Sequence, residues 1–242
     1  MTPAQLADAF SRTCVVIPAF NEGKSIENVI RAVREHMPGA AVVVVNDGSA
    51  DDTEERARDA GAVVLSLSLN LGIGGAVQTG YKYALAQGYS YAIQIDGDGQ
   101  HDPSETYHLI ERLLEGDSDL VIGSRWLGRG NYVASRNRRF GMKFLEALVS
   151  WRAKSRFTDT TSGFRALNRR AIELFAVHYP TDYPEVESIV LARHFGLRVN
   201  EVPVMMKARE HGTSSIKGLK TMYFMLRITM SVVIGVMGGE DS

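Results

Sequence analysis

Two aspartates separated by one glycine stand where an apolar segment of the chain ends. Residues 91–95 form this apolar segment, and Asp96 and Asp98 follow it. At the end of a strand, alternating positions and flexible glycines let both carboxylates turn toward one point. Hard oxygen ligands in that arrangement suit Mg²⁺ or Mn²⁺, usually shared with substrate phosphates. Aspartate and glycine also form ordinary polar turns, so the motif alone leaves both interpretations open.

The first half of the chain alternates apolar runs with helical patterns. Runs rich in β-branched residues predict buried strands at residues 14–18, 41–46, 62–67, 91–95 and 119–123. Helices are predicted between them, at residues 25–36, 52–60, 75–87 and 103–115. This alternation predicts an α/β fold whose mainly parallel sheet is covered by helices on both faces. Ligands then bind beyond the carboxyl ends of the strands.

The second half is less regular. Its patterns predict helices at residues 136–154, 169–177 and 187–195 and a strand at residues 197–202. Near the C-terminus the uninterrupted apolar stretch after Arg227 is about ten residues long, below the roughly 20 that a membrane span needs. We therefore expect one main domain, residues 1–217, with a C-terminal helical elaboration at residues 218–242. We expect that helix to pack on the domain, to form a homodimer interface, or to contact a membrane or a membrane-bound partner.

Charge is distributed unevenly although the net charge is −1. Residues 1–122 contain 8 Lys and Arg against 18 Asp and Glu, whereas residues 123–227 contain 19 against 8. An acidic half can hold a cation, and a basic half can meet phosphates or an anionic membrane surface. Nucleic acid is not an expected partner, because the arginines are dispersed among apolar segments and no nucleic-acid module motif is present.

Three further observations limit the class of protein. The single cysteine, Cys14, lies in an apolar run, which predicts a buried thiol and fits a reducing cytoplasm. The N-terminus has no apolar signal-peptide core, so we expect no export. A dinucleotide site is not expected at residues 71–75, because Val77 breaks the G-x-G-x-x-G spacing.

Several motifs occur together in a fixed order. They are VIPAFNE at residues 16–22, VVNDGSADDT at 44–53, NLG at 70–72, DGDGQH at 96–101, GSR at 123–125, TSGFR at 161–165, EVP at 201–203 and REHGTS at 209–214. This ordered set resembles family 2 glycosyltransferases of the GT-A fold, a Rossmann-like sheet flanked by helices. Within them it is similar to the dolichol-phosphate mannose synthase branch, which glycosylates polyprenyl phosphates.

The resemblance implies a nucleotide-sugar donor, a divalent metal (Mg²⁺ or Mn²⁺) and inversion at the anomeric carbon. It implies a metal site of Asp96, Asp98 and Gln100, in which Asp98 and Gln100 approach the metal and Asp96 lies near the sugar-nucleotide. Residues implied to bind the donor are Pro18, Asn21, Glu22, Asp47, Gly72, Asp96 and Arg209. Residue chemistry agrees, because a metal held by carboxylates neutralises the charge that develops on a leaving diphosphate.

A guanidinium grips phosphate bidentately, and Arg125 follows a predicted strand at the start of the basic half. It is our first candidate for contacting the acceptor phosphate. Arg136 and Arg138 are further candidates, with a solvated helix face as the alternative. A phosphate monoester has a second pKa of about 6, so it is already largely anionic near neutral pH and needs no strong base.

A sugar-hydroxyl acceptor would need a base, and Glu185 or Glu187 could provide it. Glu187 resembles the glutamate that opens a helix in the polyprenyl-phosphate branch, while Glu185 could simply be a helix N-terminal acid. Transfer to a sugar hydroxyl in cell-wall or polysaccharide assembly is thus the alternative activity. A nucleotide-sugar-binding protein without activity is the non-enzyme alternative. We expect a cytoplasmic protein, peripheral at the membrane face, where its lipid acceptor lies.

Overall fold

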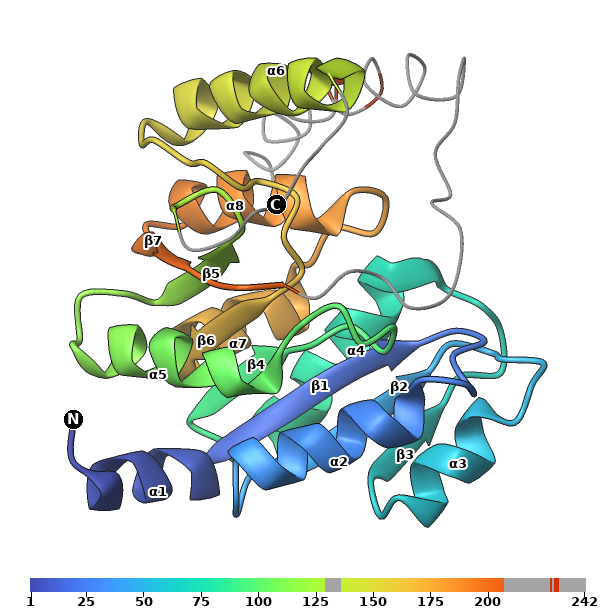
Figure 1. Cartoon of the computed structure of the whole chain (residues 1–242). Helices are drawn as coiled ribbons and strands as arrows, with labels where there is room; N and C mark the ends of the chain where they lie inside the picture. Colours follow the sequence, from blue (N-terminus) through green and yellow to red (C-terminus); the bar gives the residue numbers. More distant parts are fainter. Residues whose placement is uncertain (129–135, 207–226, 228, 231–242) are drawn as a thin grey trace.

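The computed structural model describes residues 1–128, 136–206, 227 and 229–230, and only the backbone of residues 136–140. One sheet of seven strands forms its centre (Figure 1). The strands are β1 (Thr13–Ala19), β2 (Ala41–Asn46), β3 (Val63–Ser66), β4 (Tyr91–Gln94), β5 (Leu120–Ser124), β6 (Arg165–Asn168) and β7 (Val199–Pro203). The helices are α1 (Pro3–Ser11), α2 (Ile26–His36), α3 (Thr53–Asp59), α4 (Gly72–Ala86), α5 (Thr106–Leu114), α6 (Arg136–Ala153), α7 (Arg169–Val177) and α8 (Pro184–His194).

The strand order is β3-β2-β1-β4-β6-β5-β7. Strand β6 runs antiparallel to both of its neighbours, β4 and β5, while the other pairs are parallel. The carboxyl ends of β1, β2, β4 and β5 therefore lie at one edge of the sheet. The chain enters β6 at that same edge, so the segment before β6 can reach the loops that follow β4 and β5.

Alternation along the central strands separates two apolar layers. In β1, Cys14 and Val16 pack with α4, α7 and α8, whereas Val15 and Ile17 pack with α1, α2 and α5. Both faces are covered because every residue of β1 is buried, which is what a parallel sheet inside an α/β fold requires. Burial raises the pKa of the Cys14 thiol to about 12, as expected for a cysteine within the core.

Most predicted elements are found, with a few corrections. Residues 62–67, predicted as a buried strand, form the edge strand β3, whose side chains are half-buried or exposed. The predicted helix at residues 103–115 begins with a 3₁₀ turn, Pro103–Glu105. The helix predicted at residues 187–195 is α8 and begins earlier than expected, with Pro184 in its first turn, where a missing N–H does no harm. Helix α1 and strand β6 were not predicted.

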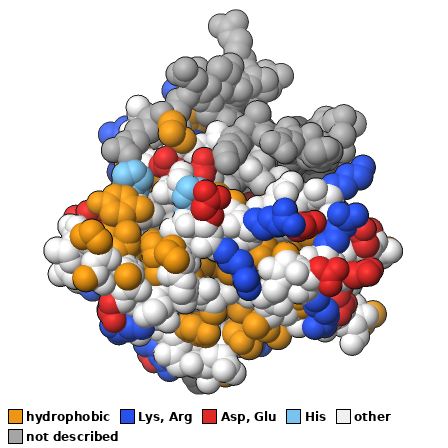
Figure 2. Space-filling model, turned by 60° about the horizontal axis from the view of Figure 1, so that its bottom comes forward, with side chains coloured by type: hydrophobic (Ala, Val, Ile, Leu, Met, Phe, Trp, Pro, Cys, Tyr) orange, Lys and Arg blue, Asp and Glu red, His pale blue; other side chains and the backbone are white. Residues whose placement is uncertain are grey.

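The surface carries both signs of charge in close proximity. Figure 2 shows acidic and basic side chains interspersed on one face of the molecule. Ion pairs one helical turn apart contribute to this pattern, such as Arg31 with Glu27 on α2 and Arg58 with Glu54 on α3. Within the described residues, no helix is long and apolar enough to cross a membrane. The predicted C-terminal helix at 218–242 lies outside the described residues except for Arg227, Thr229 and Met230.

A buried carboxylate joins three strands at the opposite edge of the sheet. Asp119 directly precedes β5, and its side chain is 2% exposed. Its oxygens accept hydrogen bonds from the backbone N and Nε of Arg198, before β7, at 2.8 and 3.1 Å, and from Nδ2 of Asn168, in β6, at 2.9 Å. Burial alone would raise the pKa of Asp119, but these hydrogen bonds and the charge of Arg198 lower it to about 2.

Asp119→Asn should therefore lower the free energy of unfolding at pH 7 by about 1–3 kcal/mol, because it weakens charge-assisted hydrogen bonds. The folded pKa lies below the ordinary 3.8. The stabilisation is thus present above pH about 4 and is lost as the pH falls through about 2. Urea denaturation of both proteins across this range checks it. A difference in stability that stays constant down to pH 2 would contradict the assignment.

Candidate active site

The first two loops at the carboxyl edge, after β1 and β2, are tied to each other. The backbone N of Asn21 donates to Oγ of Ser49 at 2.9 Å, and its side-chain Oδ1 accepts from the N of Ala50 at 2.8 Å. The N of Glu22 donates to Oγ1 of Thr53 at 2.8 Å. Asn21 has a φ of 56°, a left-handed conformation that asparagine tolerates. The loop that contains Asn21 and Glu22, which follows Pro18 and Ala19 of β1, is thus held in one shape against the second loop.

Asp47 links the second loop to the start of α4. Its backbone N donates to the Ala19 carbonyl at 2.9 Å, and its buried carboxylate accepts from the N of Leu71 at 2.7 Å. Gly72, the first residue of α4, has a φ of 78°, which favours glycine. The predicted donor residues therefore lie close together at this edge: Pro18 at the end of β1, Asn21, Glu22 and Asp47 in the two loops, and Gly72 at the start of α4.

The Asp96 loop follows β4 and is braced by His101. The backbone N of Asp96 donates to Nδ1 of His101 at 3.0 Å, so the neutral ring carries its proton on Nε2, 3.6 Å from Asp96 Oδ2. The ring of His101 is 4% exposed and stacks on Phe164 with centroids 5.0 Å apart. The Asp96 side chain is 37% exposed and accessible to a ligand. Asp98 Oδ1 accepts from the N of Gln100 at 3.0 Å and so closes the turn.

Strand register brings the segment before β6 against this loop. Gln94, the last residue of β4, pairs with Arg165, the first of β6. Because the two strands are antiparallel, the residue two positions after Gln94, which is Asp96, lies opposite the residue two positions before Arg165, which is Gly163. A Cβ at Gly163 would lie 3.0 Å from Asp96 Oδ1 and 3.1 Å from Gln94 Nε2. The TSGFR motif therefore forms a wall beside the Asp96 carboxylate, and glycine leaves the room that this carboxylate occupies.

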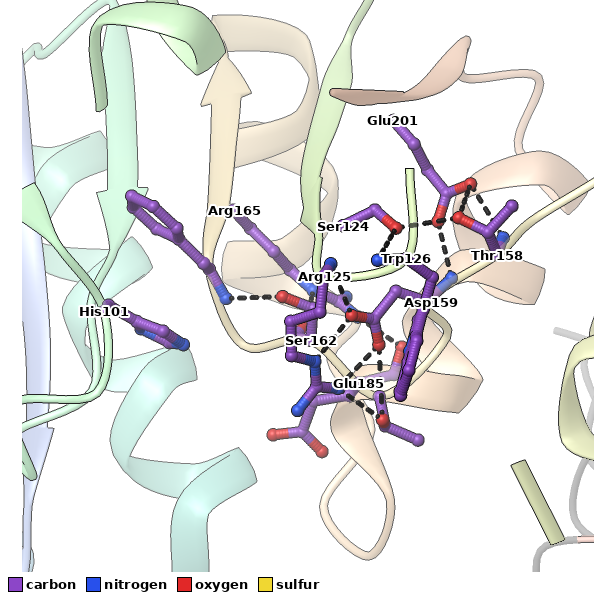
Figure 3. Close-up of polar contacts among 12 residues, drawn as sticks. His101, Ser124, Arg125, Trp126, Thr158, Asp159, Ser162, Arg165, Glu185 and Glu201 are labelled. Atoms are coloured by element: carbon purple, nitrogen blue, oxygen red, sulfur yellow. Dashed lines mark hydrogen bonds and ion pairs between the residues drawn. The ribbon is translucent and has the colours of Figure 1, made fainter. Parts of the chain in front are cut away.

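Arg125, directly after β5, is held by a carboxylate from the same segment. Its Nε donates to Asp159 Oδ2 and its Nη2 to Asp159 Oδ1, both at 2.6 Å. Nη2 also donates to Oγ1 of Thr161 at 2.8 Å. Sequence reasoning assigned no role to Asp159, because no sequence signal indicates a partner 34 residues away. The Arg125 side chain is 12% exposed, and Figure 3 shows it among these partners.

Glu185 lies beside this arginine. Figure 3 shows its carboxylate next to the Arg125 guanidinium, and Asp96 is near enough to influence its charge. Burial, the largest effect, raises the pKa of Glu185, Arg165 lowers it and Asp96 raises it further. Arg165 is almost fully buried, and its guanidinium donates to Ser188 Oγ at 2.5 Å and to the Glu185 carbonyl. The first turn of α8 is therefore anchored to β6.

The remaining predicted site residues are Glu187, Arg136, Arg138 and Arg209. Glu187 also lies in the first turn of α8, consistent with a helix N-terminal acid. The side chains of Arg136 and Arg138 and the whole of Arg209 lie outside the described residues. The structure thus brings Asp96, Glu185 and Arg125 together at one edge, with the loops after β1 and β2 on the other side of Asp96.

The residues present fit a divalent cation shared with a phosphate ligand. Within residues 1–128 and 136–206, no three His, Cys, Asp or Glu side chains form a metal-binding group. Mg²⁺ in particular usually takes only one or two carboxylates and completes its shell with phosphate oxygens and water. Asp96 and Asp98 supply that number of carboxylates, and Gln100 adds an amide oxygen.

The strand order, with β6 antiparallel to both of its neighbours, is that of the GT-A fold. The model of glycosyl transferase family 2 matches residues 14–175, and the chain belongs to this family. It is therefore an enzyme, a glycosyltransferase. The crystal structure of glucosyl-3-phosphoglycerate synthase from Mycobacterium tuberculosis with Mn²⁺, UDP and phosphoglyceric acid superposes with a TM-score of 0.74 at 23% identity. The match covers 100% of this chain and 84% of that one and shows the shared fold.

Two relatives are similar over most of their length. An undecaprenyl-phosphate mannosyltransferase of Micrococcus luteus is 30% identical over 223 residues, 86% of this chain and 88% of that protein. A UDP-N-acetylglucosamine–dolichyl-phosphate N-acetylglucosaminyltransferase of Methanococcus voltae is 27% identical over 247 residues, 91% of this chain and 97% of that protein. Both names combine a sugar transfer with a lipid phosphate.

Gly163→Ala should weaken binding of Mn²⁺ with UDP or GDP about tenfold, because the new methyl group displaces the Asp96 carboxylate. Calorimetric titration of Mn²⁺ in the presence of each nucleotide measures this. Ser162→Ala is the matched control, since it removes only the hydroxyl that accepts from the N of Phe164 at 3.3 Å. Unchanged affinity in Gly163→Ala, or an equal loss in Ser162→Ala, would show that the contact with Asp96 does not matter.

Proposed function

We propose that this glycosyltransferase moves a sugar from a nucleoside-diphosphate sugar to a polyprenyl phosphate, with inversion at the anomeric carbon. The observation that carries the proposal is the position of Arg125. Its guanidinium is fixed at the carboxyl end of β5, beside Glu185 and at the same sheet edge as Asp96. The names of the two relatives support a lipid-phosphate acceptor.

On the donor side, the loops after β1 and β2 and the start of α4 would bind the nucleotide. Asp47 would contact the base or ribose, while Pro18, Asn21, Glu22 and Gly72 shape the surface around it. Arg209 is proposed to approach the donor diphosphate. Mg²⁺ or Mn²⁺ held by Asp98, Gln100 and Asp96 would supply positive charge to the leaving diphosphate. His101 and Gly163 keep the Asp96 carboxylate in place beside that site.

On the acceptor side, Arg125 would hold and orient the phosphate, with Arg136 and Arg138 as further proposed contacts. A phosphate monoester is a competent nucleophile near neutral pH, because its second pKa is about 6. The chain therefore needs to position and partly desolvate the acceptor rather than deprotonate it. Since that acceptor is lipid-bound, we place the enzyme at the cytoplasmic membrane face. Residues 218–242 are our proposed contact with the bilayer or with a membrane-bound partner, and a homodimer contact is the alternative.

A second candidate function is transfer to a sugar hydroxyl. The observation that favours it is Glu185, whose pKa is raised by burial and which lies beside Arg125. A carboxylate with a raised pKa is a better general base near neutral pH. Glu187, in the same turn of α8, is the other carboxylate available for this role.

An acceptor panel tests the proposal. Labelled UDP-glucose, UDP-N-acetylglucosamine and GDP-mannose are each offered with undecaprenyl phosphate or with a soluble sugar acceptor, with Mn²⁺ or with EDTA. We expect metal-dependent label in the lipid phase with at least one donor, and loss of it with EDTA. Glu185→Gln should keep more than a tenth of that activity if no base is needed, since a general base contributes about 10²–10⁴-fold. Transfer only to the sugar acceptor, abolished in Glu185→Gln, would favour the second candidate.

Arg125→Ala should lower kcat/KM for undecaprenyl phosphate about 10²-fold, because a charge-assisted contact to a phosphate is removed. The KM for the nucleotide sugar should change less than about twofold. Arg125→Lys keeps the charge but not the fork, so it should recover only part of the loss. Steady-state kinetics with each substrate varied in turn measures this. An equal loss of donor affinity would place Arg125 in the donor subsite instead.

A further inference from the structure

The arginine proposed to bind the acceptor phosphate is anchored to a buried carboxylate. Asp159 is fully buried, and it accepts from the backbone N of Arg125 at 3.0 Å as well as from the guanidinium. It takes the Nε–Nη2 edge of the fork, which fixes the plane of the guanidinium. A long flexible side chain is thereby reduced to one orientation before any ligand binds, and an arginine that is already ordered loses less entropy when it binds phosphate.

Asp159 is in turn held by a second carboxylate, from the far strand of the sheet. Glu201 lies in β7, opposite Ile122 of β5. Its Oε1 accepts from the N of Asp159 and its Oε2 from the N of Thr158, both at 2.7 Å (Figure 3). Two successive N–H groups of one turn thus converge on one carboxylate. Burial, the largest effect, raises the pKa of Glu201, and these hydrogen bonds lower it.

Glu201 also reaches the residues on either side of Arg125. The Thr158 hydroxyl donates to Glu201 Oε2 at 3.1 Å, so in its 2.7 Å contact with Ser124 the Ser124 hydroxyl is the donor. The Ser124 hydroxyl accepts from the N of Trp126 at 3.2 Å. Glu201 is therefore connected to Arg125 along two routes, through Asp159 and through the backbone that flanks the arginine.

We infer that Glu201 is a positioning residue for the acceptor phosphate, acting on Arg125 through Thr158 and Asp159. This inference rests on the proposed function, since it assumes that Arg125 binds that phosphate. Glu201 does not touch substrate. It sets the place and plane of a guanidinium that does. A displacement of about 1 Å at a substrate-holding group can cost about 10²-fold in rate.

Glutamine is the discriminating substitution at this position. Its single carbonyl oxygen can accept from one of the two N–H groups, and its amide NH₂ then faces the other donor. Glu201→Gln should raise the KM for undecaprenyl phosphate or lower kcat, giving about a tenfold fall in acceptor kcat/KM. The KM for the nucleotide sugar should stay within about twofold. Asp159→Asn should show the same pattern with a larger loss, because it weakens the direct contact.

Asp119→Asn is the matched control. Asp119 is a carboxylate that, like Glu201, accepts from a backbone N–H, and it also binds an arginine, but it is more deeply buried and lies at the opposite edge of the sheet. A merely structural role for Glu201 predicts that the two variants lose stability alike and change the two substrate constants alike. The full-length chain is used throughout, and melting temperatures are measured beside the kinetics.

A double-mutant cycle decides the mechanism. If Glu201 acts through Arg125, Glu201→Gln should have almost no further effect in an Arg125→Ala background. Three results would each overturn the inference. The losses in acceptor kcat/KM from the two substitutions could multiply in the double variant, or Glu201→Gln could change the KM for the nucleotide sugar as much as the constants for the acceptor. The third is an effect of Glu201→Gln no larger than that of Asp119→Asn. If Glu201→Gln does not fold, the cycle of Asp159→Asn with Arg125→Ala carries the same test. The activity of the wild-type enzyme toward undecaprenyl phosphate is measured before any variant. If the wild-type enzyme shows none, the proposed function itself is overturned.

Discussion

The position of β6 between β4 and β5 is the constraint on which the site depends. Arg165, its first residue, pairs with Gln94 on one side and with Ile122 on the other. Because β6 runs antiparallel, the residues just before it extend past the carboxyl ends of both neighbours. That single arrangement brings Gly163 against Asp96 and Asp159 against Arg125. A parallel strand at this place would enter from the opposite edge and supply neither contact.

Buried carboxylates hold both ends of β5, with different consequences. At the start of the strand, Asp119 joins β5, β6 and β7 and serves the stability of the sheet. At its end, Asp159 and Glu201 fix the backbone and side chain of Arg125. Buried charges are costly unless hydrogen-bonded, and each of these carboxylates has several donors. The arrangement places a rigid cationic group on the side of Asp96 away from the loops that follow β1 and β2.

Periodicity in the sequence was enough to predict the parallel core, and its limits follow from the physics of each element. Strands such as β2 are unbroken β-branched runs, whereas β6 is four residues of mixed type, Arg-Ala-Leu-Asn, with no pattern to identify it. Aspartates that follow a strand, such as Asp96, can be predicted as a site because the strand locates them. Asp159 and Glu201 could not be predicted, since their roles arise from contacts across 34 to 43 residues.

The central claim is that the accepting atom is a phosphate oxygen, and the structure of the product tests it most directly. The wild-type enzyme is incubated with undecaprenyl phosphate and a nucleotide sugar carrying ¹³C at the anomeric position, and the lipid product is examined by ³¹P and ¹³C NMR. The account predicts a phosphodiester whose phosphorus couples to the labelled carbon, with the anomeric configuration opposite to that of the donor. Retained configuration, or label bound to a sugar hydroxyl rather than to phosphate, would contradict it.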